Sequence, residues 1–226
     1  MFLNFLQEVQ VLMPQIMEGL KVTLQLFFMT LVLSLPLGLI LSIGRISKIK
    51  PLQWLIQLYL LVFRGTPLML QLFFFYFGLP FITIGGVHIV LDRYPAALLA
   101  FVLNYAAYFA EIFRGGIIGV SHGQYEASKA LGLNSFQTMR YVIIPQMLRT
   151  VVPPVANETI VLVKDTALVS SIALIDMLKK AQQAVNRDMN VTAYLIVAVI
   201  YLSITLVLTF VFEKTEKKLS VSERKN

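Results

Sequence analysis

The sequence predicts an all-α membrane protein: a polytopic helical bundle of about five transmembrane helices, with the N-terminus outside and the C-terminus in the cytoplasm. Hydrophobic residues make up 58% of the 226 residues and charged residues only 14%, and the mean hydropathy is +0.77. These values lie far from those of a soluble domain. The apolar runs are continuous rather than alternating, which favours helices over a closed barrel.

Four apolar runs are long enough to cross a bilayer, since a transmembrane helix needs about 20 residues. Each contains at most one charged residue, as with Lys21 in the first, Arg64 in the second and Glu111 in the third. The four predicted spans are residues 20–44, 54–79, 94–113 and 191–212.

A fifth region, residues 141–178, is longer and less regular, with three prolines and several ionisable residues. Its last piece, TALVSSIALIDML, has 13 residues and is too short to span a bilayer alone. We therefore expect one crossing, residues 141–165, followed by a packed helical segment.

The distribution of basic residues predicts the orientation, because cytoplasmic loops of membrane proteins are enriched in lysine and arginine. With the C-terminus inside, twelve basic residues are cytoplasmic: Arg45, Lys48, Lys50, Arg114, Lys129, Arg140, Arg149, Lys214, Lys217, Lys218, Arg224 and Lys225. The opposite side then has four, namely Arg93, Lys179, Lys180 and Arg187. This places residues 121–141 in the cytoplasm.

Composition also excludes several classes of function. The chain has no cysteine, so it contains neither disulfides nor thiolate metal sites. The net charge of +7 reports topology rather than nucleic-acid binding. No repeat, low-complexity linker or second domain is evident, and residues 1–226 are interpreted as a single transmembrane domain.

The cytoplasmic segment SHGQYEASKALGLNSFQTMRYVIIPQ, residues 121–146, is polar and helix-forming. We expect a helix over QYEASKAL that ends at Gly132 in a left-handed cap. A second helix is expected to restart at Asn134 or Ser135 as N-cap, before Pro145 interrupts it. An amphipathic connector that rests among lipid headgroups is the plain alternative.

The spacing inside this segment resembles the EAA loop of the permease subunits of ABC importers. Glu126, Ala127 and Ser128 are followed by Gly132 after three residues, and by VIIP, residues 142–145, after nine more. Three positions depart from the family pattern: Ser128 replaces Ala, Val142 replaces Ile and Ile144 replaces Leu. Residues 63–80, 104–117, 123–132 and 162–170 are similar to the polar amino-acid branch of that family.

This resemblance implies partners for the chain. Family members work as dimers or pseudo-dimers, as homodimers or heterodimers, in the prokaryotic inner membrane. Two cytoplasmic ABC ATPase subunits bind their coupling helices, and an extracytoplasmic binding protein delivers the substrate. The chain has no GxxxxGK[ST] motif, so ATP and Mg²⁺ are expected in the ATPase and no cofactor in this chain.

The resemblance also assigns a coupling role to residues of this cytoplasmic segment. Glu126 is expected to make an anchoring polar contact with the ATPase, and Gly132 to allow a sharp turn, although a plain helix cap explains Gly132 equally well. The full set of expected coupling residues is Tyr125, Glu126, Ala127, Ser128, Ala130 and Gly132.

Ionisable residues at membrane depth are candidates for substrate contact, because burying their charge costs on the order of 3 kcal/mol. Glu158 has no basic neighbour within one helical turn, and Asn157 beside it offers both a donor and an acceptor. A carboxylate there suits the ammonium or guanidinium group of a basic amino acid. Pairing with Arg64 or Arg149 is the alternative.

Asn104, Tyr108 and Glu111 fall on one face of the third predicted span. Such a stripe either lines a hydrophilic path, with Asn104 and Tyr108 contacting substrate, or forms hydrogen bonds to another helix. For Glu111 we favour an ion pair with Arg114, three residues later.

Other polar residues have structural interpretations. Lys164 and Asp165 are adjacent, and we attribute them to solvation or packing near a helix break. His88 and His122 are isolated and are expected in exposed loops, without metal-ligand spacing. No catalytic triad or carboxylate pair is evident, so an enzyme is not expected.

The sequence therefore predicts the membrane subunit of an ATP-driven importer of polar amino acids, with a preference for basic ones that rests on Glu158. A secondary transporter or channel that uses its intramembrane acids as ion sites is the alternative. A structural membrane scaffold is the third possibility.

Overall fold

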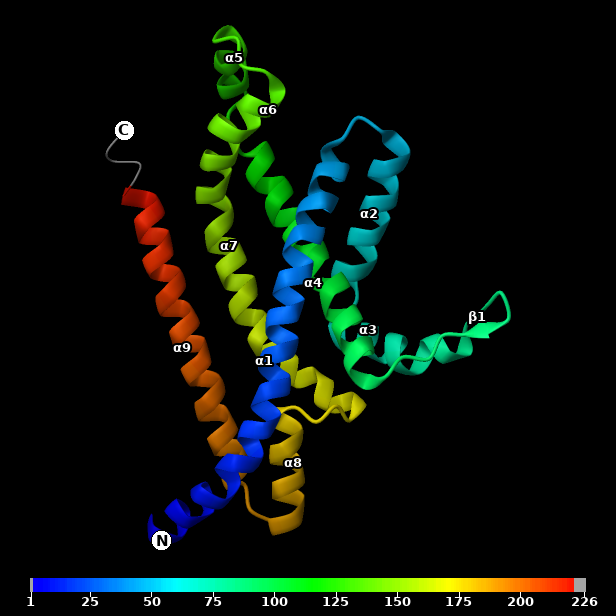
Figure 1. The fold of residues 1–226 in the computed structure, drawn as a ribbon, viewed down its shortest axis with the longest axis vertical. Coiled ribbons are helices and arrows are strands. Elements are labelled where there is room, and N and C mark those ends of the chain that lie inside the picture. The colour runs from blue at the N-terminus through cyan, green and yellow to red at the C-terminus, as the bar shows by residue number, and fades with distance from the viewer. Residues whose placement is uncertain (1, 222–226) are drawn as a thin grey trace.

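The computed structural model describes residues 2–221, and its longest helix, α1 (Phe2–Ile46), runs through the middle of the molecule (Figure 1). It packs lengthwise against α4 (Arg93–Ile118). The two backbones approach closely, since a Cβ added at Gly38 would lie 2.7 Å from Phe109 Cβ. Small residues allow such approaches between helices in membranes.

The helix α1 extends beyond the predicted span 20–44 towards the N-terminus. The additional turns are stabilised by packing, because they contact α8 (Met177–Asp188) and the start of α9 (Thr192–Val221). The buried cluster at this junction consists of Leu12, Ile16, Met177, Ala181, Ala184, Ala193, Ile196 and Val197.

The second predicted span, residues 54–79, is not one straight helix. α2 (Lys50–Gly65) ends at Thr66, and the helical stretch that follows is bent away from it by 104°. Pro67 disfavours helical backbone at the residue before it, and Thr66 is extended, with φ −118° and ψ 148°. The bent stretch consists of α3 (Leu68–Phe73), η1 (Phe74–Gly78) and η2 (Leu79–Phe81).

A short β-hairpin, which the sequence analysis did not predict, follows this stretch and projects from the side of the molecule (Figure 1). β1 (Thr83–Ile84) pairs antiparallel with β2 (Val87–His88). Gly85 and Gly86 between them have φ of 59° and 85°, as a tight two-residue hairpin turn requires.

The cytoplasmic segment folds as α5 (His122–Ala130) and α6 (Ser135–Thr138). The chain then continues through one π-helical turn, η3 (Met139–Ile143), into α7 (Ile144–Asp165). Pro145 therefore does not interrupt the helix as expected. It lies in the first turn of α7, directly after the π-helical turn, where the regular i→i−4 hydrogen bonding is already interrupted.

The packed helical segment expected after residue 165 is present over only part of residues 166–178. It forms the 3₁₀ helix η4 (Thr166–Ile172), which ends at Ala173 in a left-handed conformation with φ 56°. Asp176 then caps the N-terminus of α8, which the sequence analysis did not predict as a separate helix.

By length and hydropathy, three described helices can cross a membrane: Gln7–Ile46, Arg93–Ile118 and Thr192–Lys218. A fourth is added if α2 and the bent stretch after it count as one span. The helix α7, where the remaining crossing was expected, is not among them and carries four ionisable residues. It packs against α4 and α9.

The arrangement of the ends agrees with the predicted orientation. α5, α6 and the end of α9 lie at one end of the molecule, and the N-terminus and α8 lie at the other (Figure 1). Arg224 and Lys225, which were counted as cytoplasmic, lie outside the described residues.

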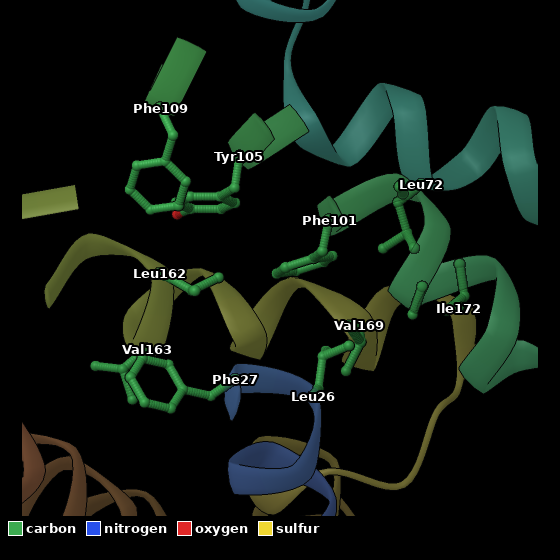
Figure 2. Packing of buried hydrophobic residues seen from close by; sticks show 12 residues of the cluster. Leu26, Phe27, Leu72, Phe101, Tyr105, Phe109, Leu162, Val163, Val169 and Ile172 are labelled. Atoms are coloured by element: carbon green, nitrogen blue, oxygen red, sulfur yellow. The ribbon is translucent and has the colours of Figure 1, made fainter. Parts of the chain in front are cut away.

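The main core joins α1, α3, α4, α7 and η4. Three aromatic residues of α4, Phe101, Tyr105 and Phe109, line one side of it (Figure 2). They pack against Leu26 and Phe27 of α1, Leu72 of α3, Leu162 and Val163 of α7, and Val169 and Ile172 of η4. The core thus ties the bent segment to the long helices.

Candidate functional site

The cytoplasmic helix α5 ends in a tight turn at Gly132, whose φ is +76°. Gly132 N–H donates to Lys129 O at 3.0 Å, and Leu133 N–H donates to Ser128 O at 3.0 Å. This pair of bonds is the Schellman arrangement. A Cβ added at Gly132 would meet no atom within 4 Å, so only the backbone conformation calls for glycine. The predicted left-handed cap is confirmed.

The next helix, α6, begins with a complete capping box. Gln137 N–H donates to Asn134 Oδ1 at 2.9 Å, and Asn134 N–H donates to Gln137 Oε1 at 2.9 Å. Of the two N-caps that the sequence allowed, Asn134 is the one used. The two caps fix the directions of α5 and α6 through local contacts alone.

The residues with an expected coupling role are mostly on the surface of this knob, which we define as residues 121–141. Ser128 is the exception: it is 2% exposed, and its hydroxyl donates to Gln124 O at 2.7 Å. Tyr125 is half-buried. The remaining four are exposed, namely Glu126, Ala127, Ala130 and Gly132.

Two large apolar side chains exposed on the knob were not predicted from the sequence. Leu131 is 80% exposed and Phe136 is 76% exposed, on either side of the turn at Gly132. Their signal in the sequence is an apolar residue at each end of a polar turn, which is common and not specific. Exposed apolar side chains on the same knob as the exposed Glu126 have the composition of a protein contact.

The knob is firmly attached to the long helices. Gln146 of α7 donates to Gln124 Oε1 of α5 at 3.2 Å. Below the knob, α4 and α7 meet so closely that a Cβ added at Gly116 would lie 2.2 Å from Val151 Cγ2 and 2.9 Å from Met147 Cγ. The knob therefore bonds to α7 directly and lies next to the place where α4 and α7 pack most closely.

Within α7, Glu158 is half-buried and Asn157 is exposed. Neither side chain forms a hydrogen bond or an ion pair with any other described residue. The direct pairing of Glu158 with Arg64, one of the structural alternatives, is not seen. A carboxylate is thus available for a ligand on this helix.

The polar stripe of α4 faces α2. Asn104 is 4% exposed, and its Nδ2 donates to Phe63 O at 2.9 Å and to Gln71 Oε1 at 3.0 Å. Gln71 Nε2 also donates to Phe63 O, at 2.9 Å. These amides satisfy a carbonyl at the end of α2, so Asn104 takes the helix-bonding alternative and stabilises the bend.

Tyr108 and Glu111 continue the stripe towards the cytoplasm. The guanidinium carbon of Arg64 lies 5.5 Å from the centroid of the Tyr108 ring, within the range of a cation–π contact. Glu111 accepts two bonds from Arg114 Nε, at 3.0 and 3.1 Å, which confirms the expected ion pair. Glu111 and Arg64 also line a cavity of about 390 Å³, with Arg45 and Gln57.

One buried polar pair was missed. Tyr105 OH donates to Asp165 Oδ2 at 2.7 Å and joins α4 to the end of α7. The two residues lie 60 positions apart, and no spacing in the sequence links them. The hydroxyl satisfies the carboxylate that had been attributed to packing near a helix break, and a break does follow, at the start of η4.

Neither histidine forms a metal site with other described residues, among which no three potential ligands gather. His122 Nδ1 lies 3.2 Å from Glu126 Oε1, four residues later on α5, and both side chains are exposed. His88 lies in β2 and is exposed, with Nδ1 3.1 Å from Pro80 O.

Comparison with known proteins gives a consistent result. Residues 34–221 match the family described as Binding-protein-dependent transport system inner membrane component. The chain is 40% identical over 211 residues to the arginine transport system permease protein ArtQ of Bacillus subtilis, which covers 93% of this chain and 94% of ArtQ. It is 34% identical over 209 residues to the glutamine transport system permease protein GlnP of Escherichia coli, covering 92% and 94%.

Solved structures share the fold. The chain aligns with a crystal structure described as an amino acid ABC transporter with histidines, with a TM-score of 0.83 and 34% identity, over 95% of this chain and 98% of that chain. The MetNI methionine ABC transporter in an inward-facing conformation aligns with a TM-score of 0.70 at 22% identity, over 94% and 98%, which shows a shared fold.

Proposed function

Since the chain belongs to the family of binding-protein-dependent transport system inner membrane components, we propose that two copies of it form the path for a basic amino acid. The chain is the permease subunit of an ABC amino-acid importer and a multi-pass protein of the bacterial inner membrane. ATP is handled by a separate ATPase subunit, and a substrate-binding protein is the second partner class.

The observation that carries the substrate proposal is the unpaired carboxylate of Glu158. A carboxylate within a segment that is predicted to cross the membrane needs a compensating charge. Arg64 acts on Glu158 electrostatically, but no described residue forms an ion pair with it. The ammonium or guanidinium of a basic amino acid does so. Relatives named for arginine, cystine and glutamine are 40%, 36% and 34% identical to the chain, so overall similarity does not distinguish among these substrates.

The proposed path lies along α2, α4 and α7. Arg64, Asn157 and Lys164 are exposed on these elements, within segments that were predicted to cross the membrane. Charged groups are very costly against lipid tails, so this face suits a water-filled path closed by a second copy. In this proposal residues 1–226 act as one domain, and the partner copy is identical.

Coupling is proposed to occur through the knob. Glu126, Leu131 and Phe136 of the knob would seat in a groove of the ATPase, and Ala127 and Ala130 would allow close approach. Because the turn between α5 and α6 is capped on both sides and the knob is attached to α4 and α7, closure of the ATPases would tilt these two helices as a unit. Tyr108, which lies on the proposed path and packs under Arg64 of α2, would move with α4.

Uptake of labelled arginine into proteoliposomes tests the substrate proposal, with the full complex, binding protein and ATP present. Glu158→Gln removes the charge at almost constant size and is expected to reduce arginine uptake about tenfold, while glutamine uptake, if present, is unchanged.

Glu213→Gln, the same change at an exposed position of α9, is the matched control and is expected to have no effect. If Glu158→Gln imports arginine as the wild type does, the reason for a basic substrate is removed. Competition by glutamine and glutamate in the same assay then defines the substrate class.

A further inference from the structure

A second cavity lies at the extracytoplasmic end of the molecule, away from Glu158. Its volume is about 780 Å³. It is bounded by α1, by η1 and η2, by the loop that leads into α4, and by the segment after η4. Aromatic side chains form much of its wall, including Tyr76 and Phe81, and Asp92 and Arg93 are its charged members.

Arg93 is held in place at the side of this cavity by two contacts. Its Nε donates to Ile172 O at 3.2 Å, and its guanidinium carbon lies 6.0 Å from the centroid of the Tyr76 ring. Ile172 belongs to the edge of the main core, beside Leu72 (Figure 2). The terminal nitrogens of Arg93 form no hydrogen bond with any described residue. The donors on these nitrogens are therefore free, in a defined orientation.

No ion pair compensates the charge of Arg93, unlike the charges of Lys180 and Arg187 at the same end. Lys180 pairs with Glu18 at 2.7 Å, and Arg187 pairs with Asp188 at 2.7 Å. Within the described part of the chain, no carboxylate lies within 4 Å of Arg93. Asp92, its neighbour, is exposed and does not use its side chain to cap α4.

We propose that this cavity is an extracytoplasmic subsite that holds the α-carboxylate of the incoming amino acid on Arg93 and its α-ammonium near Asp92. The ligand class is any free α-amino acid, because both groups belong to the part that all amino acids share. A lipid phosphate offers the same oxygens to Arg93, but an anionic headgroup would be repelled by Asp92. The inference rests on the proposed function, since it concerns the importer's own substrate.

The absence of cysteine from the chain makes a direct test possible. Val90, which lines the cavity and is 72% exposed, is replaced by Val90→Cys in the permease–ATPase complex in phosphatidylcholine nanodiscs. The rate of labelling by a membrane-impermeant thiol reagent is measured with and without arginine or glutamine. Each amino acid that the complex imports is expected to slow the labelling in a saturable way.

Matched controls distinguish the subsite from general effects. Val191→Cys, which is 62% exposed at the same end but does not line the cavity, is expected to label equally fast with and without amino acid. Argininamide, which lacks the carboxylate, is expected to protect about tenfold more weakly than arginine, and Arg93→Gln is expected to remove this difference.

A second variant, at Asp92, leaves the contact between Arg93 and Ile172 in place. Asp92→Asn is expected to weaken protection by arginine, but not protection by N-acetylarginine, which has no α-ammonium. Unchanged labelling at Val90→Cys in a complex that still imports the amino acid overturns the subsite alone. A complex that imports no amino acid overturns the proposed function instead.

The lipid source of the same chemistry is tested by adding phosphatidylglycerol to the nanodiscs. Slow labelling that depends on this lipid and not on amino acid would assign the cavity to a headgroup and overturn the proposal. Protection by amino acid that persists at every lipid composition supports it.

Discussion

At the scale of single residues, Asp176 caps α8 from a fully buried position. Its Oδ1 accepts from Lys179 N–H at 2.8 Å, and its Oδ2 accepts from Leu178 N–H at 3.2 Å. Burial raises the pKa of this carboxyl from 3.8 to about 6, against the opposing effect of the two backbone bonds and of Lys179. The folded chain therefore holds this proton more tightly than the unfolded chain.

The raised pKa of Asp176 predicts how stability depends on pH. Between pH 3.8 and about 6, the folded state binds more protons at Asp176 than the unfolded state does. The free energy of unfolding therefore decreases as the pH rises through this range. A shift of this size corresponds to a decrease on the order of 3 kcal/mol. Asp176→Asn keeps an acceptor for the cap and is expected to flatten the pH dependence of the thermal midpoint in this window. A variant with the wild-type slope would show that another group is responsible.

At the scale of the elements, the turn at Gly132 sets the angle between α5 and α6. Gly132→Ala meets no steric clash, but it forces a Cβ into left-handed backbone at about 1 kcal/mol or more. We expect weaker ATPase binding and less ATP hydrolysis per bound subunit, measured by co-purification and phosphate release.

Gly123→Ala is the control for this prediction, because Gly123 lies in the first turn of α5 without positive φ, and a Cβ there meets only Ser121 Oγ, at 3.5 Å. It is expected to be neutral or slightly stabilising. Equal losses in both variants would mean that the turn has no special role in coupling.

The crossing of α4 and α7 below the knob gives a second prediction at this scale. Gly116→Ala places a Cβ into Val151 and Met147, and we expect a loss of about 1–3 kcal/mol, seen as a lower thermal midpoint of the complex. Gly115→Ala, one residue earlier, meets no atom within 4 Å and is expected to leave the midpoint unchanged.

Steric rescue would identify the cause of that loss. Val151→Ala removes the Cγ2 atom that the new Cβ meets at 2.2 Å. The double variant Gly116→Ala with Val151→Ala is therefore expected to recover part of the midpoint lost in Gly116→Ala. If the two losses simply add, the close contact between these helices is not what destabilises the single variant.

At the scale of the whole molecule, the proposed path predicts where water reaches the helices. In this cysteine-free chain, Asn157→Cys on α7 is expected to react with a hydrophilic thiol reagent in the assembled complex. Leu202→Cys on α9, where Leu202 is 58% exposed and the helix is apolar, is expected to face lipid and remain unreactive. The reverse result would place the path along α9.

Packing across the whole molecule connects the knob at the cytoplasmic end with the cavity at the opposite end. The helix α4 ends just before the knob and α7 follows it, and the main core joins both helices to α1, α3 and η4 (Figure 2). Arg93, at the far end of α4, contacts the carbonyl of Ile172 in η4. A tilt of α4 and α7 would therefore be transmitted to the cavity beside Arg93 through packed side chains.

The sequence alone determined the helical class, the orientation and the local caps. Membrane crossing depends on the apolar length of a segment, and orientation depends on basic residues near its ends, so both follow from linear features. The caps at Gly132 and Asn134 involve residues within five positions of each other. The ion pair between Glu111 and Arg114, three residues apart, is likewise a contact between residues near in sequence.

The tertiary structure decided what depends on contacts between distant residues. The bend after Gly65 begins locally at Pro67, but it is held by Asn104, 41 positions away from Phe63. Asp165 is satisfied by Tyr105, and Arg93 is oriented by Ile172, across 60 and 79 positions. A hydrogen bond requires its partner within about 3.5 Å, and only the packed helices bring such partners together. Hydropathy and spacing along the chain do not predict these contacts.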